Sequence, residues 1–319
     1  MRCITGRTAL AAFGPVPAEP VASRQTTMAA LALLAVAAAW GLSFPLTKEL
    51  LAQVGPADVL AQRYVIAAVI SGVLLLKWTR RLSARAWRDG VILGVLYAVG
   101  GLLQVEGLAH TSASISGFTT GMYVVLTPVC AFLLLKTRIR PVWWAGALLA
   151  AAGLAVMSLD GLGLGYGEAV TLVSALVYAL HIVGLSQWST ARDALGLSVV
   201  QLAVTAVICL LFAAPDGITL VSGTASWIGI AYLGLVSGAL AMIAQSWGQA
   251  HLPSTRSAVI LVSEPVWAAA LSIGFFAEPL TARILIGGAM MVAAMLLVEL
   301  APRRPGDAPH AENIPHLET

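Results

Sequence analysis

Ten long runs of apolar residues restrict the folds that this sequence can adopt. A helix that crosses a bilayer needs about 20 mostly apolar residues. The runs cover approximately residues 28–47, 59–76, 90–109, 114–135, 142–158, 169–188, 197–214, 227–250, 257–277 and 284–300. Because lipid gives the backbone no hydrogen-bond partners, each run must form a helix or a strand of a closed barrel. The runs are too long and too uniformly apolar for alternating barrel strands. We therefore predict an all-α polytopic membrane protein with ten transmembrane helices.

Composition excludes several other classes of protein. Of the 319 residues, 59% are hydrophobic and 10% are charged. In an average soluble domain about 45–50% of the residues are apolar and about 25% are charged. A soluble globule, a disordered chain and a nucleic-acid binder are all poor fits. Two of the three cysteines, Cys130 and Cys209, fall within apolar runs, so a disulfide framework is not expected. No phosphate-binding loop or zinc-spaced Cys/His cluster occurs, so we expect no cofactor, no metal and no enzyme.

The two ends differ in character from the apolar runs. Residues 1–27 carry arginines, and the prolines between them break the apolar stretch that a signal peptide requires. We interpret this segment as a cytosolic tail, although Met28 is an alternative start. Residues 301–319 are polar and predicted to be a disordered cytosolic tail.

The distribution of Lys and Arg predicts the orientation of the protein in the membrane. With ten spans, 15 of the 18 Lys and Arg residues fall on the side of the N-terminal tail, and Lys48 and Arg283 fall on the other. Arg63 lies within a span. Cytoplasmic loops carry an excess of Lys and Arg, so both termini are expected in the cytosol and the protein in the plasma membrane.

The two halves of the chain resemble each other. Gly107–His110 precedes the fourth run, and Gly248–His251 precedes the ninth run 141 residues later. Five runs per half make the halves enter the membrane from opposite sides, as in the inverted repeats of many secondary transporters. Chance similarity of apolar sequence is the alternative. We expect repeats at residues 28–160 and 167–300.

The prolines distinguish the two halves. Pro128 lies 18 residues after His110, and Pro265 lies 14 residues after His251. Since proline kinks a helix, and four residues make about one helical turn, we expect the two kinks to lie at different depths.

Several short motifs resemble those of EamA-type transporters in the drug/metabolite transporter superfamily. They are Trp40–Phe44, Thr111–Ser114, Gly117–Tyr123, Glu264–Val266 and Glu278–Thr281. The resemblance covers residues 28 to about 300, with one departure: the first half has Lys136 where the second has Glu278. It implies a ten-helix exporter of small organic solutes, most often amino acids or related metabolites. A carrier of cationic drugs or other metabolites, and a membrane sensor or scaffold without transport, are the alternatives.

Glu264 is the main candidate for substrate binding or coupling. Ionisable residues inside membranes are costly and mark functional sites by default. Glu264 directly precedes Pro265. A proline disfavours helical backbone angles at the residue before it, so a local break is expected at Glu264. Its carboxyl group could exchange protons or meet a cationic group on the solute, or it could only shape the kink.

Other polar and aromatic residues complete the predicted site. Arg63, Glu106 and His110 are candidates for an outer gate. The alternative is a purely structural role, in which Arg63 snorkels outward or pairs with Glu106. The remaining candidates for the substrate site are Trp40, Ser43, Phe44, Tyr123, His181 and Trp267, each of which could equally serve packing. The pairs Gly90/Gly94, Gly117/Gly121 and Gly234/Gly238 indicate close helix packing, within one bundle or between subunits of a homodimer.

Overall fold

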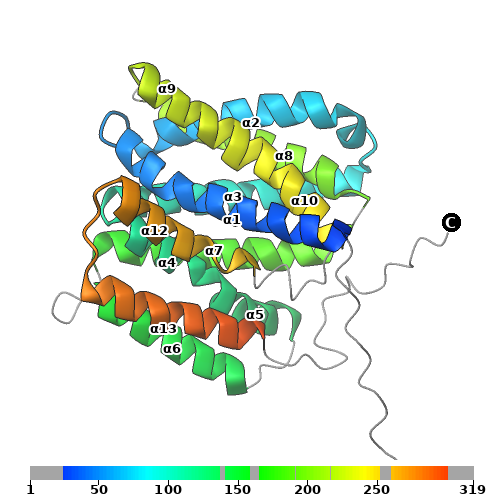
Figure 1. Cartoon of the computed structure of the whole chain (residues 1–319). Coiled ribbons are helices and arrows are strands. Elements are labelled where there is room, and N and C mark those ends of the chain that lie inside the picture. Colours follow the sequence, from blue (N-terminus) through cyan, green and yellow to red (C-terminus); the bar gives the residue numbers. More distant parts are fainter. Residues whose placement is uncertain are drawn as a thin grey trace, which may run out of the picture.

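The protein is a bundle of helices (Figure 1). The computed structural model describes residues 24–136, 141–158, 165–190, 192–215, 217–251 and 260–300. The first half contains α1 (Arg24–Leu50), α2 (Pro56–Thr79), α3 (Ala84–Ala109), α4 (Ala113–Gly121), α5 (Tyr123–Leu135) and α6 (Pro141–Ser158). The second contains α7 (Tyr166–Trp188), α8 (Ala194–Ala213), α9 (Thr224–Ala231), η1 (Tyr232–Leu240), α10 (Ala241–His251), α12 (Glu264–Phe275) and α13 (Ala282–Glu299). These described residues form no strand.

The predicted spans are found to a large extent. Seven helical stretches within the described residues are long and apolar enough to cross a membrane. The runs at 141–157 and 282–298 form shorter apolar helices, and the ninth run is described only from residue 260. The chain is thus a multi-pass all-helical protein, whereas the count of ten and the two-repeat arrangement stay predictions. The predicted tails at 1–27 and 301–319 lie outside the described residues, except that α1 already begins at Arg24.

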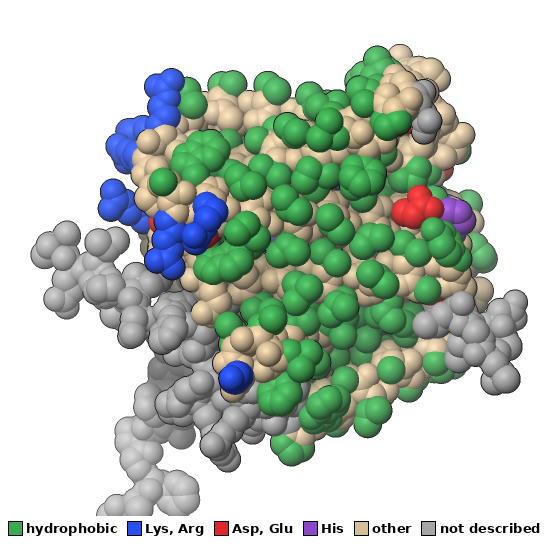
Figure 2. Space-filling view, turned by 180° about the vertical axis from the view of Figure 1, so that it is seen from behind, with side chains coloured by type: hydrophobic (Ala, Val, Ile, Leu, Met, Phe, Trp, Pro, Cys, Tyr) green, Lys and Arg blue, Asp and Glu red, His purple; other side chains and the backbone are tan. Residues whose placement is uncertain are grey.

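The surface has the pattern of a membrane protein. Figure 2 shows hydrophobic side chains over the middle of one face, with Lys and Arg gathered at one end. We call this the cation-rich end; it carries Lys77, Arg80, Arg81, Arg85, Arg88 and Arg192, at the end of α2 and the starts of α3 and α8. The opposite end carries Lys48, Glu106, Glu278 and Arg283.

Helix contacts follow a symmetric scheme. α2 packs on α8, α6 packs on α13, and α4 packs on α12. If the two halves are exchanged, the pair α3–α7 becomes α10–α1, and the pair α5–α7 becomes α12–α1; all four pairs are in contact. This arrangement is what two five-helix repeats would produce.

The helices corresponding to the fourth and ninth runs are both interrupted. Met122 separates α4 from α5 and lies 12 residues after His110. Ser263 precedes α12 and lies 12 residues after His251. The two breaks thus lie at matching positions in the two halves. Pro128 lies six residues after the first break, and the expected difference in depth between the proline kinks stays a prediction. Pro265 is accommodated as the second residue of α12, where its missing N–H costs no helical bond.

The predicted glycine pairs all lie where helices approach closely. A Cβ at Gly94 would lie 2.8 Å from Cβ of Val204, and one at Gly234 would lie 2.7 Å from Cβ of Ile66. A Cβ at Gly117 would lie 2.8 Å from Cβ of Ala268. These contacts are within one bundle, so the glycine pairs do not indicate a homodimer.

Replacing Gly94 should destabilise the protein. The Gly94→Ala methyl group meets the rigid Val204 side chain, and overpacking of this kind costs about 1–3 kcal/mol. We expect a lower midpoint of thermal unfolding in detergent. Gly72→Ala is the control, because a Cβ at Gly72 in α2 has nothing within 4 Å. Equal unfolding midpoints for the two variants would contradict close packing of α3 on α8.

Candidate functional site

The π-helix η1 anchors a polar cluster at the centre of the bundle. Trp40 Nε1 donates to the backbone oxygen of Ser237 at 2.9 Å, and the hydroxyls of Ser43 and Ser237 are 2.8 Å apart. Arg63 Nη2 donates a longer bond, 3.4 Å, to the same Ser237 hydroxyl. π-helical segments occur frequently at functional sites. Ser237 therefore joins α1, α2 and η1 at one point.

Arg63 lies inside the bundle, two turns into α2. Its guanidinium carbon is 5.2 Å from the centre of the Tyr64 ring, which places the cation over an aromatic face. Its Nε is buried and has no hydrogen-bond partner among the described residues. The donors of Arg63 are thus only partly used by the protein.

Aromatic side chains continue the cluster across α3 and α7. The ring centres of Tyr64 and Tyr97 are 5.9 Å apart, and those of Tyr97 and Tyr178 are 5.8 Å apart. His181 lies 5.4 Å from the Tyr97 ring and shares a 2.7 Å hydrogen bond with Gln201. His181 is 8% exposed, so it is buried with one ring nitrogen hydrogen-bonded.

Glu264 begins α12, directly after the break. This helix runs 12 residues towards the opposite end, a rise of about 18 Å. Glu264 therefore lies near the middle of a hydrocarbon core about 30 Å thick. The side chain is only partly buried, and within the described part of the chain no hydrogen bond or ion pair is made by its carboxylate.

Arg63 and Glu264 both lie close to α1. Arg63 bonds Ser237, which accepts from Trp40 of α1, and α12, which begins at Glu264, packs against α1. No direct ion pair joins the two charges, since the three ion pairs of the described residues involve other side chains. A cation and an anion thus lie close to the same helix, α1, and neither forms an ion pair within the described residues. Such an arrangement could bind a carboxylate at Arg63 and an ammonium group at Glu264.

The other predicted site residues have mixed settings. Trp267 is partly buried and packs with Trp40 beside Val36 and Ala37. Phe44 is 5% exposed and packs against Leu108, Ala113 and Ala268, which is a setting typical of the core. Tyr123 packs along the edges of two hydrophobic clusters of the bundle.

The three residues predicted as an outer gate do not form one cluster. Nδ1 of His110 lies 3.6 Å from the carboxylate of Glu106, as their spacing predicts. The Tyr166 hydroxyl donates to the same carboxylate at 3.4 Å, and its ring packs edge-on against His110. Arg63 belongs to the central cluster instead.

Lys48 and Glu278 bond backbone groups on either side of the α3–α4 connection, which the sequence did not predict. Lys48 Nζ donates to the backbone oxygens of Leu108 and Ala109, at 2.7 and 2.9 Å. Glu278 accepts from the backbone N–H of Ser114 at 3.1 Å. The cation meets the C-terminus of α3 and the anion meets the N-terminus of α4, so each charge is favoured by the helix dipole. We call this arrangement the α3–α4 clamp.

Sequence reasoning missed Tyr97, Tyr178 and the clamp as parts of the site. A tyrosine hydroxyl inside an apolar run was the available signal for the two tyrosines, since buried hydroxyls seek partners. Lys48 and Glu278 carried no such signal, because each lies at the end of a run and meets backbone groups far away in sequence.

Comparison with known proteins gives a consistent picture. The sequence model of the EamA-like transporter family matches residues 27–159 and 165–300. An uncharacterised transporter of Archaeoglobus fulgidus is 28% identical over 270 residues, 85% of each chain. One of Pseudomonas aeruginosa is 33% identical over 198 residues, 59% of this chain and 63% of that protein. A solved crystal structure with 18% identity has a TM-score of 0.59 over 86% of this chain and 96% of its own, which indicates a shared fold.

The clamp leads to a prediction about stability. Glu278→Ala removes the acceptor for the Ser114 N–H and the anion near Lys48, and an unsatisfied buried donor costs about 1–3 kcal/mol. We expect a lower midpoint of thermal unfolding in detergent. Glu49→Ala, an exposed acid next to Lys48, should stay within about 0.5 kcal/mol of the wild type. The clamp would lose its support if both variants unfolded at the same temperature.

Proposed function

Since the chain belongs to the EamA-like transporter family, we propose that it carries a small zwitterionic solute, such as an amino acid or a related metabolite, bound between Arg63 and Glu264. The observation that supports this proposal is a cation and an anion close to the same helix, α1, that form no direct ion pair with each other. Leaving two such charges uncompensated is costly in a protein interior. A solute that carries both complementary charges would offset this cost.

Aromatic side chains suit the rest of the solute. The rings of Tyr64, Tyr97 and Tyr178 lie next to one another, and Trp40 and Trp267 both pack against one small hydrophobic cluster. Binding sites for small molecules combine apolar and aromatic walls with a few placed polar groups. A cationic drug bound at Glu264 alone is the competing substrate class, and it would leave Arg63 without a role.

The transport cycle that we propose is alternating access between two inverted repeats, residues 28–160 and 167–300. The exchange symmetry of the helix contacts supports these repeats, and secondary transporters of this construction bind substrate at the repeat interface near the midplane. Export is the proposed direction. We place the protein in the plasma membrane with both termini in the cytosol. Glu264 could also carry a proton during the cycle.

Loss of the Glu264 charge should abolish transport. Glu264→Gln keeps the shape of the side chain but removes the anion that would hold an ammonium group. We expect counterflow of labelled amino acids in proteoliposomes to occur with the wild type and not with this variant, at equal amounts of folded protein. Glu49→Gln is the control because its carboxylate is exposed. Undiminished counterflow by Glu264→Gln would exclude Glu264 from the mechanism, and absence of flux of any solute by the wild type would favour a sensor or scaffold.

Arg63 should select for the solute's carboxylate. A hydrogen bond to a charged group contributes about 1.5–3 kcal/mol, so Arg63→Gln should weaken binding of the transported amino acid at least about tenfold. Competition by the corresponding amino-acid amide, which lacks the carboxylate, should be unchanged. Arg85→Gln is the control, since Arg85 is exposed at the cation-rich end. Equal loss for the acid and the amide would refute carboxylate recognition by Arg63.

A further inference from the structure

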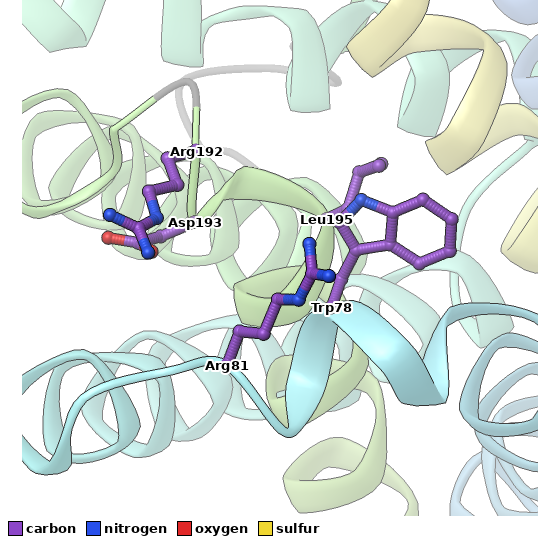
Figure 3. Close-up of a pocket in the computed structure, with 5 residues that line it drawn as sticks. All are labelled: Trp78, Arg81, Arg192, Asp193 and Leu195. Atoms are coloured by element: carbon purple, nitrogen blue, oxygen red, sulfur yellow. The ribbon is translucent and has the colours of Figure 1, made fainter.

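A pocket of about 260 Å³ lies at the cation-rich end, away from the central cluster. Its lining comes from the end of α2 and the start of α8: Trp78, Arg81, Arg192, Asp193 and Leu195 (Figure 3). In this view the Arg81 side chain rises from the end of α2 beside Trp78, with Arg192 across from it. The chain therefore brings two arginines more than 100 residues apart in sequence to one pocket.

A groove of about 590 Å³ adjoins this pocket and shares Trp78 and Arg81 with it. The remaining lining is Val73, Leu74, Leu76, Lys77 and Arg80. Val73 is 74% exposed, and Leu74 and Leu76 are also exposed. One part of the groove is therefore apolar and belongs to the membrane-facing surface of α2, while the other is cationic.

The cations of this region lack acidic partners. Within the described residues, no ion pair is formed by Lys77, Arg80, Arg81 or Arg192. Arg85 and Arg88 differ, because both contact Asp89. The acid of the pocket, Asp193, accepts a 2.9 Å hydrogen bond from the Thr190 hydroxyl. The pocket and the groove together thus hold four cations without an ion pair among the described residues, and one carboxylate that is already hydrogen-bonded.

We propose that this pocket and groove bind an anionic phospholipid. Arg81 and Arg192 hold the headgroup phosphate, a group that the planar guanidinium fits well. Trp78 lies at the level of the headgroups, as interfacial tryptophans do. An acyl chain lies along Val73 and Leu74. A soluble phosphate would use only the cationic part, whereas a phospholipid fits both the cations and the apolar wall.

The test uses the full-length protein in detergent and native mass spectrometry. The probes are phosphatidylglycerol, phosphatidylcholine and glycerol 3-phosphate. Since each basic residue contributes about fivefold to binding of anionic lipid, the double variant Arg81→Gln/Arg192→Gln should bind phosphatidylglycerol about 25-fold more weakly. The control Arg24→Gln/Arg85→Gln removes two exposed cations that line neither the pocket nor the groove and should bind like the wild type.

A third variant tests the apolar wall. Leu74→Asn should weaken binding of phosphatidylglycerol and leave binding of glycerol 3-phosphate unchanged, because only the lipid contacts this side chain. The proposal is overturned if both double variants lose phosphatidylglycerol equally, which would indicate general attraction. It is also overturned if phosphatidylcholine binds as tightly, or if glycerol 3-phosphate displaces the lipid at equal concentration.

Discussion

The lack of hydrogen-bond partners in a bilayer governs this structure. Every backbone group in the hydrocarbon core must be satisfied by the protein, so each interruption of a helix needs compensation. The breaks before Tyr123 and Glu264 lie against each other, since a Cβ at Gly121 would lie 2.9 Å from Pro265. At the opposite end, Lys48 and Glu278 supply partners for the ends of α3 and α4. Among the described residues, these two breaks and the α3–α4 connection thus lie against other parts of the bundle.

Charge is treated differently at the centre and at the ends of the bundle. At the opposite end the clamp gives each charge a helix terminus, and Glu106 pairs with His110. At the centre Arg63 and Glu264 stay without a direct ion pair among the described residues. Stability alone would favour removing such charges. Under the proposed function, these charges serve binding of the solute rather than folding.

Local patterns in the sequence predicted much of the fold, and long-range contacts explain what they did not predict. Apolar runs predicted the helices because a span needs a fixed length of apolar sequence. The glycine pairs predicted close approaches between helices, because a glycine has no Cβ to keep the neighbouring helix away. Glu264 could be predicted as a site candidate because it is an acid within an apolar run and directly precedes a proline. The split between Arg63 and Glu106 and the contacts of Lys48 could not be predicted, because they depend on which helices are neighbours in space. The break before Tyr123 was not predicted, because the kink in this run was expected at Pro128, which lies further on within α5.

The π-helix has a consequence for how relatives of this protein can differ. A π-helical segment closes its hydrogen bonds at i→i+5 instead of i→i+4, so η1 holds a wider turn than the α-helices on either side. Removing one residue from Tyr232–Leu240 could return the segment to α-helix without breaking the chain of backbone bonds. In an alignment of the family, single-residue gaps within a membrane span should therefore concentrate at this segment. Homologues with such a gap would present a different side chain at the position of Ser237, and with it a different partner for Trp40 and Arg63.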